Sequence, residues 1–222
     1  MSTHQATSLF PIHGELTGDA QGWGSRTTAT LLACGAVAGP LFIAATFIQA
    51  FTRAGFDITL HPPSLLSLGE GGWIQVANFV GCGLLFIAGA VGLRRASAGK
   101  WAPVLIALVG VGMIIGGLFS ADPGLGFPAG APAGQPSTMS WHAMLHLAGF
   151  GIGYTALVAA CFVCARRYWY SAIVGALTAA CFVFVMSGLS HGNLLPLWFA
   201  LIVGWTWVSI IPARLLAARE SA

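Results

Sequence analysis

Three histidines in the C-terminal half are the side chains best suited to chemistry. His142 and His146 are four residues apart, so on a helix they lie one turn apart and could chelate one metal ion. His191, from a neighbouring segment, could complete a zinc site that keeps one position open to activate water. The spacing does not require zinc, because the glutamate of the zinc-protease helix motif is missing. A haem would need histidines from two helices at matched depth. The remaining alternative is hydrogen bonding at a polar helix interface.

Two carboxylic acids, Asp57 and Asp122, offer a second kind of chemistry. Kept protonated by partial burial, either could act as a general acid, for example in a proton-initiated terpenoid cyclisation. With His142 and His146 they are the candidate catalytic residues. Arg53 could bind an anionic headgroup, or form a salt bridge with Asp57 or Asp122. The candidate substrate-binding residues lie near the same end of the apolar segments: Arg53, Gln49, Gln75, Asn78, Trp73 and Trp141.

Long apolar segments must position these side chains. The chain of 222 residues is 57% hydrophobic and only 7% charged, far below the charge of an ordinary soluble domain. A helix of about 20 apolar residues crosses the hydrocarbon layer of a membrane. Backbone polar groups cannot stay unpaired in lipid, so the segments should be helices of one bundle. The prediction is an all-α polytopic membrane protein with six transmembrane helices at about 28–51, 73–93, 101–121, 140–165, 169–189 and 194–213.

Basic residues predict the orientation of the bundle. They cluster before the first segment, after the second, fourth and sixth, and only Arg53 lies on the opposite side. Because lysine and arginine accumulate in cytoplasmic loops, both termini should be cytoplasmic in a bacterial inner membrane. Trp73, Trp141 and Trp198 should mark the outward boundary. Residues 1–25 and 217–222 are expected to be cytoplasmic tails around a domain at 26–216. The small net positive charge of the chain follows from this topology and does not indicate a nucleic-acid partner.

With this topology, the candidate residues of five segments reach the same outward depth. Polar side chains at such a depth usually face the bundle interior and pair with one another. We therefore expect one outward-opening pocket, which the long loops at 52–72 and 122–139 either cover as a lid or border as disordered connectors. Pairs of glycines four apart predict close helix packing: Gly35 and Gly39, Gly112 and Gly116, Gly149 and Gly153. The cysteines should serve packing as well.

Short motifs resemble a bacterial integral membrane family called "domain of unknown function 998". They include Arg53-Ala-Gly-Phe-Asp57, Gly72-Trp73-Ile-Gln75 with Asn78, the Asp122-Pro123 loop, and Ser140-Trp-His142 with His146. The resemblance runs from roughly residue 30 to 170, so His191 lies outside it. It implies a six-helix membrane bundle and no particular activity. The resemblance makes the outward polar residues stronger candidates for a functional site, because the family motifs contain these same residues.

Three functions are compatible with these patterns. The first is an enzyme that acts on a lipid or isoprenoid-like amphiphile, by acid–base chemistry or with a metal-activated water. The second is a protein that binds or transports a lipid or small solute without changing it; the off-centre polar groups and the lack of an inverted repeat favour binding over transport. The third is a structural or accessory subunit whose polar residues only fix the register of its helices. The sequence does not determine the substrate or the oligomeric state.

Overall fold

A computed structural model describes residues 18–96 and 98–220 of the chain, and within them every regular element is a helix. The short 3₁₀ helix η1 spans Pro63–Ser67. The bundle consists of α1 (Gly18–Thr52), α2 (Gly72–Arg95), α3 (Trp101–Leu118), α4 (Trp141–Ala165), α5 (Tyr170–Met186) and α6 (Leu195–Glu220). The described part contains no β-strand, only one isolated bridge between Gly124 and Phe127. The all-helical prediction is confirmed.

Five of these helices are long and apolar enough to cross a membrane, which makes the chain a multi-pass membrane protein. The exception is α5, which has 17 residues and is therefore about 26 Å long. Its predicted span, 169–189, extended three residues further, but the chain turns at Ser187–Gly192 and three residues there, Gly188, His191 and Gly192, take positive φ angles.

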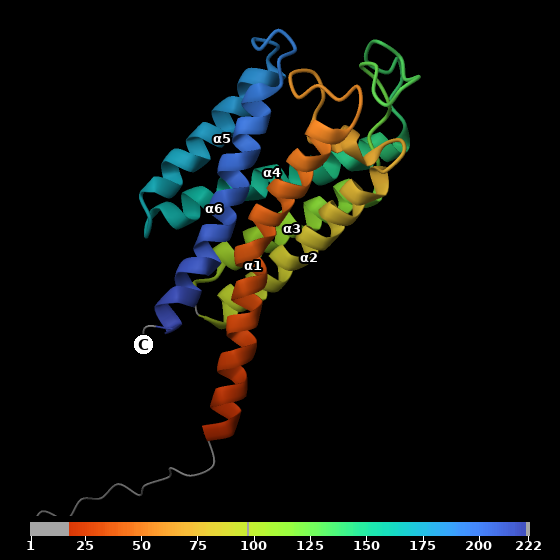
Figure 1. Cartoon of the computed structure of the whole chain (residues 1–222). Coiled ribbons are helices and arrows are strands. Elements are labelled where there is room, and N and C mark those ends of the chain that lie inside the picture. Colours follow the sequence, from red (N-terminus) through yellow and green to blue (C-terminus); the bar gives the residue numbers. More distant parts are fainter. Residues whose placement is uncertain (1–17, 97, 221–222) are drawn as a thin grey trace, which may run out of the picture.

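The two predicted tails are partly helical. Helix α1 begins at Gly18, so residues 18–25 belong to it, whereas residues 1–17 lie outside the described part. Helix α6 continues to Glu220, so most of the expected C-terminal tail is helical as well. The start of α1 and the end of α6 lie at the same end of the bundle (Figure 1).

The helices form a ring in chain order. Each helix packs against the helices before and after it, and α6 packs back against α1 and closes the ring. At the closing seam the Ser209 hydroxyl accepts a hydrogen bond from the Gly39 N–H and donates one to the Gly35 carbonyl, both at 2.9 Å. A Cβ on Gly39 would stand 2.2 Å from the Trp205 carbonyl oxygen, so this position needs glycine. The predicted packing role of Gly35 and Gly39 is confirmed.

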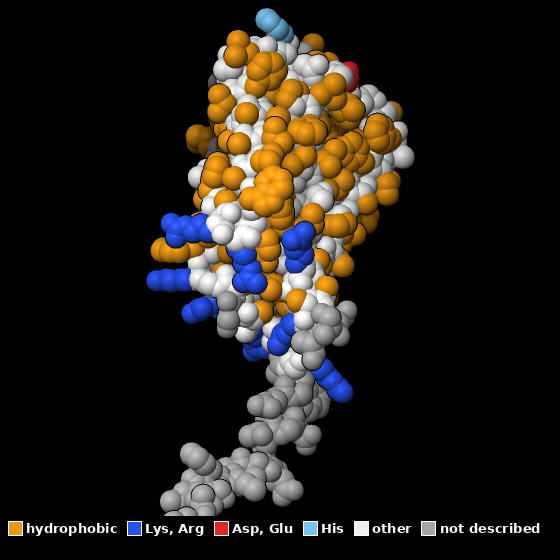
Figure 2. Space-filling model, turned by 90° about the vertical axis from the view of Figure 1, so that its left-hand side faces the viewer, with side chains coloured by type: hydrophobic (Ala, Val, Ile, Leu, Met, Phe, Trp, Pro, Cys, Tyr) orange, Lys and Arg blue, Asp and Glu red, His pale blue; other side chains and the backbone are white. Residues whose placement is uncertain are grey.

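The two ends of the ring differ in charge. Apart from Arg53, the basic side chains of the described part gather at one end, which we call the basic end (Figure 2). The opposite end, called the loop end, carries Asp57, Glu70 and Asp122 on its loops. The basic half of the ring is filled by a continuous apolar core that includes Phe86, Leu157 and Val208. Open space is therefore found toward the loop end.

The tryptophans at the helix ends behave as predicted with one exception. Trp73 and Trp141 at the loop end are exposed, as expected for anchors at a membrane boundary. Trp198 is buried, with 2% of its surface exposed, and its Nε1 donates to the His61 carbonyl at 3.1 Å. The prediction that Trp198 marks the outward boundary was wrong, because the loops fold over this residue.

Candidate functional site

A cavity of about 980 Å³ lies in the loop half of the ring and is lined by residues of all six helices. Helix α6 lines it with residues four apart, Leu197, Leu201 and Trp205, whereas α1 and α2 contribute one residue each, Phe42 and Phe79. Its deepest wall includes Phe42, which lies ten residues before the end of α1 at Thr52, or about 15 Å below the loop end. The cavity is mostly apolar, and its polar side chains are few: Ser64, Asp122, Gln135, His146, Tyr154 and Ser190.

Three segments at the loop end, 53–71, 119–140 and 187–194, cover the cavity and are called the lid. His61 joins the lid and the bundle. Its Nε2 bonds the Leu125 carbonyl of the second segment at 2.9 Å, its Nδ1 accepts the Asp57 N–H at 2.9 Å, and its carbonyl accepts the bond from Trp198. The first lid segment also accepts a bond from the third, where the Leu194 N–H meets the Thr59 carbonyl at 2.8 Å. The lid is thus a connected structure, which favours the lid hypothesis over disordered connectors.

Arg53 is part of the lid and does not line the cavity. Its two terminal nitrogens donate to the carbonyl oxygens of Leu66 and Leu68, each at 2.6 Å, and its guanidinium lies 5.1 Å from the ring centre of Phe127. Burial lowers the pKa of the guanidinium from its ordinary value, while the Glu70 carboxylate nearby opposes this shift. The expected salt bridge with an aspartate is not formed among the described residues. Arg53 is therefore a structural cation of the lid.

The two aspartates are hydrogen-bond acceptors. The Asp57 carboxylate accepts from the backbone N–H and hydroxyl of Thr59, and the Asp122 carboxylate accepts from the Ser140 N–H at 2.7 Å. In both cases these bonds hold the pKa of the carboxyl below its ordinary value. The prediction that burial keeps either one protonated was wrong, because donors reach both carboxylates. Asp122, which lines the cavity, carries its negative charge there.

His146 is the clearest candidate for chemistry. Its side chain is 7% exposed and lines the cavity. Its Nδ1 lies 2.9 Å from both the Gly116 and the Phe119 carbonyl oxygens, at the end of α3 where carbonyls lack helical partners. Carbonyls only accept, so Nδ1 carries the proton, and in the neutral ring Nε2 holds the lone pair. Nε2 has no hydrogen bond within the described part of the chain. His146 can therefore accept a proton or a hydrogen bond from a molecule in the cavity.

The other two histidines of the proposed metal set lie elsewhere. His142 is exposed at the start of α4 and stacks on Trp141 with 3.7 Å between ring centres. His191 is exposed on the third lid segment and borders a different pocket. Across the described residues no group of three or more His, Cys, Asp or Glu side chains is placed to hold a metal ion. The structure does not bring His142, His146 and His191 together. His146 is buried at the end of α3, whereas His142 and His191 are exposed at the loop end.

Gln49, Gln75 and Asn78 form a hydrogen-bonded cluster between α1 and α2. All three are buried. Gln75 accepts from Gln49 at 2.7 Å and from Asn78 at 3.2 Å, and both Gln75 and Asn78 donate to the hydroxyl of Thr46. None of the three lines the cavity. The structure therefore places these candidates for substrate binding in a helix interface, where they fix the register of α1 against α2.

Two polar atoms of the cavity wall have no partner among the described residues. Ser190 Oγ and Trp205 Nε1 are buried there without a hydrogen bond, on residues that are each 8% exposed. An unpaired buried polar group costs about 1–3 kcal/mol, so such groups mark positions where a ligand or water is expected. Sequence analysis did not single out Trp205. The only available signal was that Trp205 lies in the middle of an apolar helix, away from the boundary where tryptophan is common.

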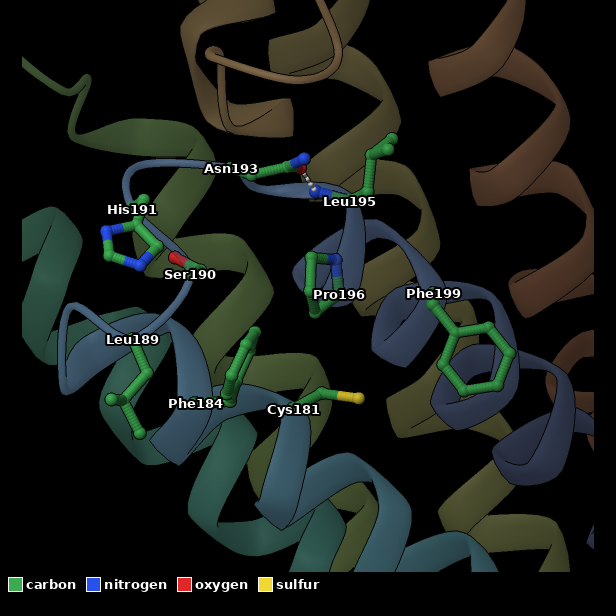
Figure 3. A pocket seen from close by; sticks show the side chains of 9 residues that line it. All are labelled: Cys181, Phe184, Leu189, Ser190, His191, Asn193, Leu195, Pro196 and Phe199. Atoms are coloured by element: carbon green, nitrogen blue, oxygen red, sulfur yellow. Dashed lines mark hydrogen bonds between the residues drawn. The ribbon is translucent and has the colours of Figure 1, made fainter.

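A side groove of about 580 Å³ lies between α5 and α6 near the loop end (Figure 3). Phe184 and Leu189 lie on one side of it and Pro196 and Phe199 on the other. Phe184, Leu189 and Phe199 are exposed, so this groove opens toward the outside of the ring. Ser190 belongs both to this groove and to the cavity. The short α5 therefore leaves a thin wall between the cavity and the outer surface of the bundle.

The fold and the site together define a class: a multi-pass helical membrane protein with a lid-covered, mainly apolar cavity. The chain belongs to the family described as "protein of unknown function (DUF998)", whose model matches residues 36–214. This match includes α5 and most of α6, beyond the stretch of 30–170 that the motifs indicated, so His191 lies within the family region. Neither the curated proteins nor the solved structures compared with it include a match.

Proposed function

We propose that this membrane protein binds a long-chain amphiphile in the cavity, with its chain among the apolar walls and its polar group beneath the lid. The observation that carries the proposal is a large apolar cavity whose wall contains unpartnered polar atoms on Ser190 and Trp205. Its volume of about 980 Å³ lies within the range of roughly 300–1,000 Å³ that is usual for small-molecule sites. An amphiphile would fill the apolar space, and its polar group would supply a hydrogen-bond partner to Ser190 at the lid.

The proposal includes an orientation and an entry route. The gathering of basic side chains at one end favours a cytoplasmic location for that end, which would place the lid outside the cell membrane. The side groove between α5 and α6 would face lipid and offer a lateral path past Ser190 into the cavity. Membrane lipids, rather than water-soluble molecules, are therefore the expected source of the ligand.

A filled-cavity variant tests the proposal. Met113 lines the cavity and is buried, whereas Leu108 on the same helix is exposed and faces away from it. Native mass spectrometry of gently extracted protein should detect a retained lipid in the wild type and in Leu108→Trp, but not in Met113→Trp. Met113→Trp must remain folded, as judged by its melting temperature and elution volume. A wild type that retains no amphiphile, and whose melting temperature no added single-chain amphiphile raises, would contradict the proposal.

Catalysis on the bound amphiphile is a second candidate, favoured by the geometry of His146. Two carbonyl oxygens hold its Nδ1–H, and this leaves Nε2 available as a general base toward a hydroxyl in the cavity. The lipid released from the wild type would be incubated with fresh protein and followed by mass spectrometry. Conversion by the wild type but not by His146→Gln, with binding retained in both, would support catalysis. An unchanged lipid in both would leave binding as the function.

A further inference from the structure

We propose that the polar group of this ligand is an uncharged hydroxyl rather than a phosphate or a carboxylate. The inference rests on the proposed binding function and specifies the chemical class of the ligand: a long-chain or isoprenoid-type alcohol. It follows from the charges and the hydrogen-bonding groups that line the cavity.

The cavity wall carries negative charge without a compensating cation. Among its described residues, Asp122 is the only carboxylate, and none is a lysine or an arginine. Hydrogen bonding to the Ser140 side chain and to its backbone N–H favours the ionised form of Asp122. An anionic group beneath the lid would meet the like charge of this half-buried carboxylate, which water screens only in part. Phosphate and carboxylate headgroups are therefore disfavoured.

The one cation of the loop end cannot easily reverse this preference. Arg53 already donates to the carbonyls of Leu66 and Leu68 and lies against Phe127, which is 2% exposed. To reach an anion in the cavity, the guanidinium would have to give up its bonds to these two carbonyl oxygens, which are partly buried. The loss of these bonds offsets what an exposed ion pair would contribute.

The remaining polar groups suit a hydroxyl. Nε2 of His146 is an acceptor and needs a donor from the ligand. Ser190 Oγ is unpartnered and can either accept or donate. A hydroxyl group offers both one donor and two acceptor lone pairs, whereas an ionised phosphate or carboxylate only accepts and would face the lone pair of His146. The cavity should therefore favour a hydroxyl over a phosphate or a carboxylate for two reasons: its charge, and its need for a hydrogen-bond donor from the ligand.

Four probes with the same alkyl chain test this inference: hexadecanol, hexadecyl phosphate, palmitate and hexadecane. Binding to the full-length protein in lipid nanodiscs would be measured by native mass spectrometry after removal of co-purified lipid. We expect hexadecanol to bind at least about tenfold more tightly than the phosphate or palmitate, a ratio within the range that unfavourable charge placement produces. His146→Ala should weaken hexadecanol binding and leave hexadecane binding unchanged.

Matched charge variants separate the cavity from the protein surface. Asp122→Asn should reduce the preference for hexadecanol over hexadecyl phosphate several-fold. Asp57→Asn makes the same change of charge on a lid residue outside the cavity wall and should leave the preference unchanged. Equal or tighter binding of the phosphate or palmitate by the wild type would overturn the inference while the proposed binding function stood. Binding of none of the four probes would overturn both.

Discussion

Nε2 of His61 donates a hydrogen bond to the carbonyl oxygen of Leu125, 64 residues later in the chain, over a distance of 2.9 Å. The direction of this bond is fixed, because Nδ1 of the same ring accepts the Asp57 N–H and so carries no proton. The ring is almost fully buried, at 2% exposed. One side chain therefore sets how two long loops lie over the cavity.

Replacing His61 by alanine should loosen the lid. The Leu125 carbonyl and the Asp57 N–H would both lose their partner, and each unpaired group costs about 1–3 kcal/mol if it stays buried. We expect a melting temperature several degrees lower and faster amide exchange across 53–71 and 119–140, measured by hydrogen–deuterium exchange. His191→Ala is the control, because His191 is exposed on the lid and forms no side-chain hydrogen bond in the described structure. Equal amide exchange rates in the two variants would show that His61 does not hold the lid in place.

The ionised state of Asp122 predicts how stability depends on pH. Hydrogen bonding to the Ser140 side chain and to its backbone N–H lowers the pKa of Asp122 from the ordinary value of 3.8, so the unfolded chain takes up its proton at a higher pH than the folded chain does. The stabilisation is therefore complete above about pH 5 and is lost as the pH falls through the folded pKa. Asp122→Asn should flatten the melting temperature between about pH 5 and pH 3 relative to the wild type.

Glu70→Gln provides the control for this pH profile. Glu70 is exposed on the lid, and its carboxylate has no hydrogen bond within the described residues. The variant loses the same charge as Asp122→Asn and should keep the wild-type acid profile. A profile that flattens equally in both variants would show that the total charge of the loop end, and not the Ser140 bond, governs acid stability.

Gln75 distinguishes a structural role from a binding role. Its side chain is fully buried, accepts from Gln49 and donates to Thr46, and both of these partners lie on α1. Gln75→Leu should lower stability by about 0.6–1.7 kcal/mol for each interhelical bond lost, the range known for such bonds in membrane proteins. Binding of the retained amphiphile should change less than twofold. Gln135→Ala removes an exposed amide at the cavity wall. This variant should weaken amphiphile binding and leave stability nearly unchanged. A Gln75→Leu protein that is stable but does not bind would restore the predicted binding role.

The helices could be predicted from the sequence because the membrane imposes one physical rule on them. Every backbone polar group in lipid must be paired, so apolar length alone identifies a helix. The predicted bounds of α2 and α4 differ from the observed bounds by two residues or fewer at each end. The rule says nothing about helices that extend beyond the membrane, and for this reason the helical residues 18–25 and 217–220 were assigned to tails.

The candidate site was predicted only in part, because sequence spacing fixes a helix face but not where the neighbouring helix ends. His142 and His146 share a face of α4, yet only His146 is hydrogen-bonded to the last carbonyls of α3, whereas His142 contacts the ring of Phe119. Asp122 and His146 were correctly expected at one cavity. The lid contacts of His61 depend on loops more than 60 residues apart in sequence, a distance over which no local pattern carries information.

Two glycines of α3 test how far a spacing motif can be trusted. Gly112 and Gly116 are four apart and were both predicted to serve helix packing. A Cβ on Gly112 would lie 2.5 Å from the Gly149 carbonyl oxygen of α4, whereas one on Gly116 would meet nothing closer than 3.8 Å, at His146. Gly112→Ala should therefore force α3 and α4 apart and lower stability by about 1–3 kcal/mol. Gly116→Ala should be neutral or stabilising by up to about 1 kcal/mol, the helix preference of alanine over glycine. Melting curves of the two variants in the same detergent test this prediction. Equal losses of stability in both variants would mean that Gly116 packs against α4 as closely as Gly112 does.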